Sequence, residues 1–369
     1  MSRPTLLLPT LLLIGGIAIL PAPAVHAQQI LEIDFDSGRT IIDDEWRAMM
    51  AVPVAVDWER NILYVDDAEE PEGIMAFSLE TGEWLRTIAT PRGEGPYEFP
   101  QGRAGIDFAP GGGLYVSGHM RVVEYDARDM PIRSWRPEAT LAERVCNLGG
   151  APAVPTLRGV VRRGPDGESE PVGPIAEPAG VADSVVIRDP DAYIRIRGTR
   201  IACLGDLAYV AMANEEGPDS VFVYHRSGEE GRVAVPVSGV RDRTGCMRRY
   251  QWGGELVEEP CPHWSERARL SFDDHENLVL LGYDNETHGA IINPDTGCYA
   301  LIRNTTRGQH EPIRVHADSV LVFHNPFEVT EEDGRTVYNI TGNSAYRVSM
   351  HALRRESGEP CPGMLPSVR

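Results

Sequence analysis

Lysine is absent from this sequence. All 35 basic residues are arginines, and against 55 acidic residues they leave a formal net charge of −20 over 369 residues. The absence of lysine excludes a lysine-dependent phosphate-binding loop, a Schiff-base lysine and the lysine-dependent serine hydrolases. The excess of negative charge argues against a nucleic acid partner, because binding to phosphates needs clustered cations. Long apolar runs are missing after residue 20, so no later segment is expected to span a membrane.

The first 27 residues are predicted to form a secretory signal peptide. Arg3 precedes an apolar run from Leu6 to Leu20, and Val25-His26-Ala27 places small residues at the −3 and −1 positions before Gln28. A membrane anchor is the weaker alternative, because the apolar run is shorter than the roughly 20 residues that span a bilayer. We therefore expect residues 28–369 to form one mature domain that is secreted or periplasmic.

The cysteine pattern agrees with an oxidising compartment. No C-x-x-C pair occurs, which argues against zinc-ribbon and thioredoxin-like sites. In an oxidising compartment widely spaced cysteines favour structural disulfides. The six candidates are Cys146, Cys203, Cys246, Cys261, Cys298 and Cys361. A Cys246–Cys261 bridge is the best single expectation, and the other two pairings stay open.

A repeated pattern of short strands predicts an all-β fold. Runs of β-branched and aromatic residues alternate with clusters of Gly, Pro, Asn and Asp. Equivalent strands are marked by Leu63, Leu114, Leu207, Leu278 and Val320. One interval is nearly twice the usual one, which leaves room for an unmarked unit between Leu114 and Leu207. Six units of roughly 50 residues are typical of a six-bladed β-propeller, whereas a β-sandwich gives no reason for such an interval.

The two ends of the chain are expected to meet. Ile30 to Phe35 is an alternating strand that precedes the first unit, and Tyr346 to Met350 resembles the third strand of a last blade that lacks its fourth. A propeller protects its sheet edges by sharing one blade between the termini. We expect the amino-terminal strand to be the outer strand of the sixth blade.

A family resemblance is found in the segment Arg92-Gly93-Glu94-Gly95-Pro96-Tyr97-Glu98-Phe99-Pro100. With the strand and turn that follow it, this segment resembles the linker of bacterial secreted six-bladed propellers of the NHL-repeat or TolB-like type. The resemblance is good over residues 52–126, patchy to residue 350 and lost over residues 140–200. It implies the fold but no activity, because such propellers include lyases, lactonases, receptors and scaffolds.

The candidate site is a face of acidic loops. In four-stranded antiparallel blades, the loops between the second and third strands share one face with the linkers between blades. Several of these loops are acidic, so this rim would favour cationic groups or calcium. The ligand-binding candidates are Asp66, Glu69, Arg92, Glu94, Asp284 and His324. No metal ligand set and no cofactor are assigned.

Three functions fit this reading. The first is a non-enzymatic binding or scaffold propeller that recognises a protein, a peptide or a small molecule on its acidic loop face. The second is a metal-dependent lactonase- or lyase-like enzyme, which needs polar ligands converging from different blades; the histidines considered are His263, His288, His310, His316 and His324. The third is a polysaccharide binder with exposed aromatic platforms, for which the candidates are Trp84, Trp135, Trp252 and Trp264.

Overall fold

The structure is a computed structural model. It describes residues 29–43, 49–67, 73–100, 102–118, 120–137, 144–156, 159–173, 199–211, 220–228, 230–235, 246–252, 255–260, 269–281, 287–303, 310–324, 327–332, 335–340, 347–359 and 361. Within these ranges the regular structure is strand, apart from one short 3-10 turn, η1 (Pro110–Gly112). The chain is therefore all-β, as predicted.

Four sheets each consist of four consecutive antiparallel strands. The first has β2 (Met49–Asp57), β3 (Ile62–Asp67), β4 (Gly73–Ser78) and β5 (Trp84–Ala89), and the second has β6 (Arg103–Phe108), β7 (Leu114–Gly118), β8 (Arg121–Tyr125) and β9 (Pro131–Trp135). The third has β10 (Cys146–Leu148), β11 (Ala151–Thr156), β12 (Gly159–Arg163) and β13 (Ser169–Gly173), and the fourth has β14 (Arg200–Leu204), β15 (Leu207–Ala211), β16 (Ser220–His225) and β17 (Glu230–Ala234).

An eight-stranded sheet brings the amino-terminal strand to the end of the chain. Its order is β20-β21-β22-β23-β1-β28-β25-β24. Its strands are β1 (Gln29–Ile42), β20 (Arg269–Phe272), β21 (Leu278–Leu281), β22 (Thr287–Ile292), β23 (Tyr299–Arg303), β24 (His310–His316), β25 (Ser319–His324) and β28 (Arg347–Ser357). Strand β1 pairs in parallel with β23 and antiparallel with β28, where Ile33 lies opposite Leu353. The first strand of the domain therefore pairs with the last.

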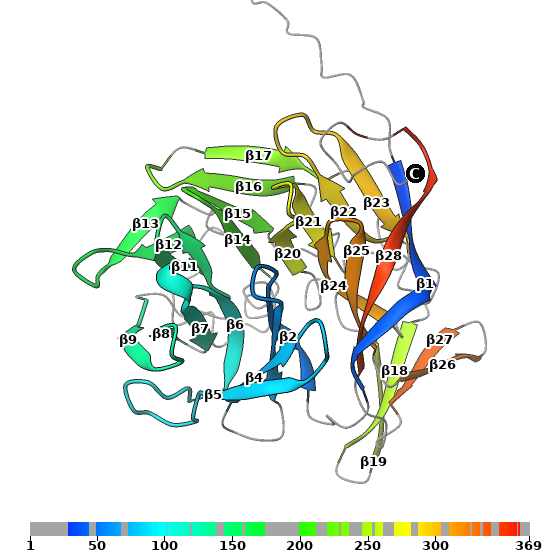
Figure 1. The fold of residues 1–369 in the computed structure, drawn as a ribbon, viewed down its shortest axis with the longest axis horizontal. Helices are drawn as coiled ribbons and strands as arrows, with labels where there is room; N and C mark the ends of the chain where they lie inside the picture. Colours follow the sequence, from blue (N-terminus) through cyan, green and yellow to red (C-terminus); the bar gives the residue numbers. More distant parts are fainter. Residues whose placement is uncertain are drawn as a thin grey trace, which may run out of the picture.

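The sheets are arranged around a common axis, as in a β-propeller (Figure 1). The first strand of each unit contacts the next in cyclic order: β2, β6, β10, β14, β20, β24 and again β2. Apolar clusters fill the spaces between successive units. One of them packs Tyr64 and Ile74 of the first sheet against Val116 and Val123 of the second. Burial of such side chains is the main stabilising term of the fold.

The marker residues of the sequence repeat occupy equivalent places. Leu63, Leu114, Leu207, Leu278 and Val320 lie in β3, β7, β15, β21 and β25, each the second strand of its unit. The unmarked unit between Leu114 and Leu207 is the third sheet. Its second strand contains Pro152 and Pro155, which cannot donate backbone hydrogen bonds. This composition explains why no strand signature is legible there.

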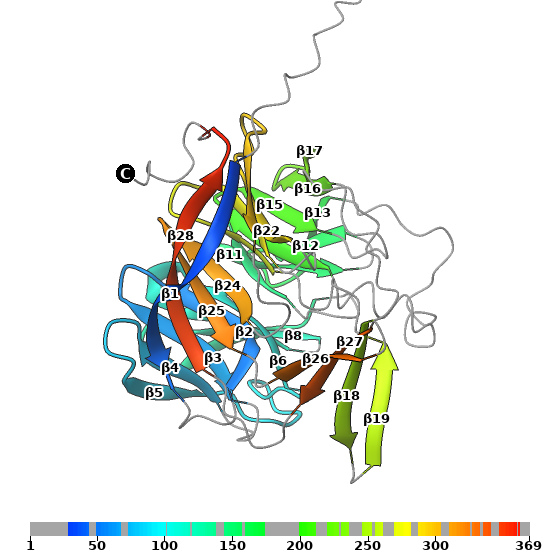
Figure 2. The same cartoon turned by 90° about the vertical axis from the view of Figure 1, so that its right-hand side faces the viewer.

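A further sheet stands apart from the ring (Figure 2). Its order is β19-β18-β27-β26, formed by the hairpins β18 (Cys246–Trp252) and β19 (Glu255–Pro260), and β26 (Phe327–Glu332) and β27 (Arg335–Ile340). The two hairpins join through parallel pairing of β18 with β27. The sequence predicts that the segment between β25 and β28 is one of the acidic loops between second and third strands. The structure instead places the hairpin of β26 and β27 there, and β27 pairs with the distant strand β18.

The linker motif holds the first two sheets together. The Arg121 guanidinium donates to the backbone carbonyls of Gly95 and Glu98, and the Glu98 carboxylate accepts the Gly95 N–H at 2.7 Å. Phe99 is completely buried in the apolar cluster between the two sheets. The motif that resembles the NHL-type linker therefore has a structural role.

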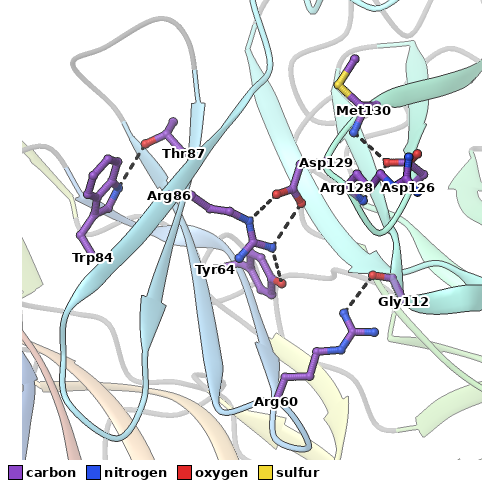
Figure 3. A network of polar contacts seen from close by, with 10 residues as sticks. All are labelled: Arg60, Tyr64, Trp84, Arg86, Thr87, Gly112, Asp126, Arg128, Asp129 and Met130. Carbon is purple, nitrogen blue, oxygen red and sulfur yellow. Dashed lines mark hydrogen bonds and ion pairs between the residues drawn. The ribbon is translucent and has the colours of Figure 1, made fainter.

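A second set of polar contacts links these two sheets (Figure 3). The Arg86 guanidinium of β5 forms an ion pair with Asp129, in the turn before β9, and lies 3.4 Å from the Tyr64 hydroxyl of β3. Arg60, in the turn after β2, donates to the Gly112 carbonyl at 3.0 Å. These contacts fix the spacing between the sheets on the outside of the molecule.

Two cysteine pairs lie at disulfide distance. Cys146 and Cys203 have Cα atoms 5.5 Å apart and join β10 to β14, while Cys298 and Cys361 have Cα atoms 5.9 Å apart. The second pair ties the segment after β28 to the turn before β23. Cys261 lies outside the described residues, so the predicted Cys246–Cys261 pair stays a prediction. Among the residues described, no helix has the length and apolarity that a membrane crossing requires.

Candidate ligand-binding site

Asp66 lies in the interior rather than on an exposed rim. Its side chain forms an ion pair with the guanidinium of Arg103, which is also buried. The same guanidinium donates to the backbone carbonyl and the hydroxyl of Thr90, at 3.1 and 3.0 Å. This pair joins β3 to β6 across the first two sheets, which explains why a carboxylate at the end of a strand is buried.

The other sequence candidates are scattered. Arg92 and Glu94 are exposed on the linker between the first two sheets. His324 is buried, with 9% of its surface exposed, at the end of β25. Glu69 and Asp284 lie outside the described residues. The structure therefore brings no pair of the described candidates into direct contact.

A group of charged side chains does converge on the axis of the ring. We call it the axial cluster, and it consists of Asp107, Arg144, Arg269, Glu311 and Arg314. These residues come from β6, β20 and β24 and from the residues just before β10. Strands that begin different sheets approach one another only around the axis, so the axis is where these charges meet.

Asp107 is held by backbone groups of two sheets. Its carboxylate accepts the N–H of Asn147 in β10 at 2.7 Å. Burial raises the pKa of Asp107 to about 6, although the Phe108 and Asn147 N–H groups and the Arg314 charge oppose that shift. A carboxyl group with such a pKa is able to exchange protons near neutral pH.

Arg314 is the most constrained cation of the axial cluster. Its guanidinium donates to the Val54 carbonyl of β2 at 2.6 Å and to the Ile313 carbonyl at 2.8 Å. Burial and the positive charges of Arg269 and Arg144 lower the pKa of Arg314 to about 10, and Asp107 only partly offsets them. At neutral pH the side chain stays charged, so the energetic cost of burying this charge lowers the stability of the folded protein.

Arg269 has a carboxylate partner nearby. It lies 2.5 Å from a carboxylate oxygen of Glu311, and both side chains are largely buried. Arg269 begins β20 and Glu311 is the second residue of β24. First strands run away from the face that carries the linkers and the loops between second and third strands. This ion pair therefore lies toward the loop face singled out from the sequence.

Sequence reasoning missed the axial cluster because no local pattern encodes it. Its five members come from four separate segments of the chain. One signal was available: Asp107 and Arg314 each stand between two apolar residues in the first strand of a unit. That signal identifies polar positions in strands but does not reveal which of them meet.

A second cluster lies where β1 meets the final strands. We call it the seam cluster, and it consists of His310, His324, Ser349 and His351. Nδ1 of His324 lies 2.6 Å from Nδ1 of His310, and Nε2 of His324 contacts the Ser349 hydroxyl. That hydroxyl lies 2.6 Å from Nε2 of His351, whose Nδ1 lies 3.3 Å from the Asp34 carbonyl of β1. The Phe35 ring packs against His310 and His351.

The Asp34 carbonyl fixes the direction of every hydrogen bond in the seam cluster. Because the carbonyl accepts, Nδ1 of His351 donates and its Nε2 accepts from Ser349. The Ser349 oxygen then accepts from Nε2 of His324, and Nδ1 of His324 accepts from His310. This chain of hydrogen bonds is complete when all three imidazoles are neutral. Burial is the largest cause that lowers the pKa of His310 to about 4 and of His324 to about 3, and it also lowers the pKa of His351.

The seam cluster lacks access for a substrate. Ser349 and His351 have the spacing of a nucleophile and its base, but both are buried and His324 covers the hydroxyl from the other side. Within the described residues, no group of three or more His, Cys, Asp or Glu is arranged to hold a metal ion. Of the remaining histidines considered, His316 stacks on Trp58, while the side chains of His263 and His288 lie outside the described residues.

The tryptophans proposed as aromatic platforms separate into two groups. Trp135 is buried in the core, whereas Trp84 is 49% exposed on the edge strand β5. The Trp84 indole N–H lies 3.3 Å from the Thr87 hydroxyl (Figure 3). The side chains of Trp252 and Trp264 lie outside the described residues. The described tryptophans therefore offer a single exposed ring and not a platform.

Two solved structures are similar to this chain. U3-55K, a β-propeller protein, has a solved structure that superposes with a TM-score of 0.50 and 10% sequence identity, over 87% of this chain and 99% of that one. YCF48, solved bound to the D1 peptide, gives a TM-score of 0.45 and 9% identity, over 90% of this chain and 100% of that one. No family model matches the chain. No curated protein matches it either. The likeness to U3-55K indicates a β-propeller and nothing about activity.

Proposed function

We propose that this chain is a secreted or periplasmic, non-enzymatic binding or scaffold propeller. In this proposal it has six blades, with the eight-stranded sheet counted as two of them and with β1 as the outer strand of the last. The pairing of β1 with β28 and the cyclic contacts of the first strands support that count. The signal peptide predicted over residues 1–27 and the two disulfide pairs support the compartment.

The observation that carries the binding function is the convergence of the axial cluster. Charged side chains are costly to bury, and structural ones are normally paired. Here Arg314 is held deep in the ring beside two other arginines, with carbonyls as its hydrogen-bond acceptors. A fold stabilised only by its core has no need of such an arrangement. We infer that the axial cluster is the ligand site, and that a protein, a peptide or a small molecule reaches it from the loop face.

Selection of peptides tests this function and does not require that the ligand be identified first. A displayed random peptide library is selected on the purified protein and then assayed on the Glu311→Gln and Asp107→Asn variants. Arg60→Gln is the matched control, because Arg60 lies in an outer turn and contacts the Gly112 carbonyl. The proposal predicts peptides that bind one per chain, lose at least tenfold in affinity on an axial variant and keep it on the control.

Turnover is the outcome that would overturn the proposal. The same proteins are assayed with lactone, ester and polysaccharide lyase substrates, with and without added calcium or zinc. Activity of the wild type that is lost in Asp107→Asn would assign the axial cluster to an enzyme. Selected peptides that bind all three variants equally would move the ligand site away from the axis.

A further inference from the structure

The second half of β1 connects the last strands of the chain to the first sheet. Strand β1 lies along β28 (Figure 2), and among the described strands β23 pairs only with residues 29–32 of β1. Further along, Ile41 and Ile42 are buried in an apolar cluster that includes residues of the first sheet. The Arg39 guanidinium donates to two backbone carbonyls in the turn between β4 and β5, at 2.8 Å each. Release of this half from β28 would therefore loosen the junction between the last strands and the first sheet.

A bulge in this half of β1 covers two histidines of the seam cluster. Residues 35–38 of β1 stand against the single residue His351 of β28. The Asp34 carbonyl accepts from Nδ1 of His351 at 3.3 Å. The Phe35 ring packs against the His310 and His351 rings, with centroids 4.7 and 5.0 Å apart. The bulge therefore holds β1 on β28 through contacts with imidazoles, which are the side chains that titrate between pH 5 and 8.

The seam cluster is a poor place for a positive charge. Ser349 and His351 are buried, and a buried charge is costly unless it is paired. Arg347 stands directly opposite His324 on the neighbouring strand. Among the described residues, the charged groups beside these histidines are Asp34 on β1, Glu311 on β24, and Arg347 and Arg354 on β28, while β25 contributes His324 itself. Both carboxylates of that set already form ion pairs with arginines.

We propose that the seam cluster is a pH-sensitive switch, in which protonation of the histidines covered by β1 releases the second half of that strand from β28. The closed seam favours neutral imidazoles, whereas the released strand uncovers them to water, where they bind protons. Falling pH therefore favours the released state. The Cys298–Cys361 pair ties the segment after β28 to the turn before β23, so residues 29–32 of β1 stay in place. This switch goes beyond the proposed binding function and does not depend on it.

Hydrogen exchange read by mass spectrometry tests the release on the purified wild-type protein. Exchange rates are divided by the intrinsic rate at each pH and compared at pH 7.0 and pH 5.0. Peptides that cover residues 33–42 are expected to lose about tenfold in protection, because release returns the pKa of His310 from about 4 to about 6.5. Peptides from β3 and β7 are expected to keep their protection. Unchanged protection over residues 33–42, or an equal loss in β3 and β7, would overturn the proposal.

Two substitutions in β1 separate proton binding from a general weakening of the strand. A Cβ atom at Gly38 would collide with the His351 ring, so Gly38→Ala is expected to expose residues 33–42 already at pH 7.0. Arg39→Gln is the matched control, because it weakens the same junction without contacting a histidine. It is expected to lower protection by the same factor at both pH values. Full protection in Gly38→Ala at pH 7.0, or loss of the pH dependence in Arg39→Gln, would contradict the switch.

Histidine variants test the groups that bind the protons. His310→Gln and His351→Gln are each expected to bring the protection of residues 33–42 at pH 5.0 closer to its value at pH 7.0, relative to the wild type. If neither variant folds, nuclear magnetic resonance of the wild-type imidazoles decides. Signals of neutral rings for His310 and His351 at pH 6.0 in the closed seam agree with the switch. Signals of charged rings at pH 6.0, with residues 33–42 still protected, would refute it.

Discussion

The seam cluster makes stability depend on pH in the range where imidazoles titrate. The pKa values of His310 and His324 are lowered to about 4 and about 3, from about 6.5 in an unfolded chain. As the pH falls below about 6.5, the unfolded chain therefore binds protons at these histidines that the folded protein does not bind. The contribution of these two histidines to the free energy of unfolding is complete above that pH and is lost as the pH falls toward 4. A proton on Nδ1 of His324 would face the N–H of His310 across 2.6 Å.

The size of the effect follows from those shifts. Between pH 7 and pH 5 each of the two imidazoles would remove about 2 kcal/mol from the free energy of unfolding. His310 is only partly buried, so solvent screening reduces the sum to about 2–3 kcal/mol for the pair. Asp107 acts in the opposite direction, because its folded pKa of about 6 is raised and the folded protein takes up that proton more readily. The prediction therefore concerns the difference between variants rather than the wild type alone.

Urea unfolding at pH 7.0 and at pH 5.0 measures that difference. The wild type is expected to lose about 2–3 kcal/mol more than a His310→Gln, His324→Gln double variant. The double variant is expected to be less stable at pH 7.0, because it breaks the hydrogen-bonded chain through Ser349. His225→Gln serves as the control, since His225 is the last residue of β16 and its partner is Ser227 in the turn that follows. Equal losses in the wild type and the double variant would refute the reasoning.

Three further outcomes are expected. Asp66→Asn should lower the free energy of unfolding by about 3 kcal/mol, because it removes the carboxylate charge that pairs with the buried Arg103 guanidinium; an unchanged urea midpoint would contradict this. A Cys146→Ser, Cys203→Ser double variant should be about 2–4 kcal/mol less stable than the oxidised wild type and equal to it under reducing conditions, as urea unfolding would measure. Deletion of residues 28–36 should abolish the folded state by circular dichroism, whereas removal of residues 1–27 alone should preserve it.

The repeat could be predicted from the sequence because its determinants are local. Alternating strands and turn residues lie within a few positions of one another, so the markers fell on equivalent strands. The third unit was not recognised in the sequence because β11 has prolines in place of the usual strand residues. The hairpin of β26 and β27 was not predicted for a different reason. Its partner strand β18 is distant in the chain, and pairing between distant segments leaves no periodic trace.

The candidate residues were chosen for charge, and charge alone does not distinguish a rim from an interior. Asp66 lies near the end of β3 and was expected to bind a ligand, yet its partner Arg103 lies in the next sheet. His324 was expected on the same rim, but it ends a strand against β24 and β28. Each outcome depends on a residue contributed by another strand. The axial cluster and the seam cluster share that property, so both required the three-dimensional fold.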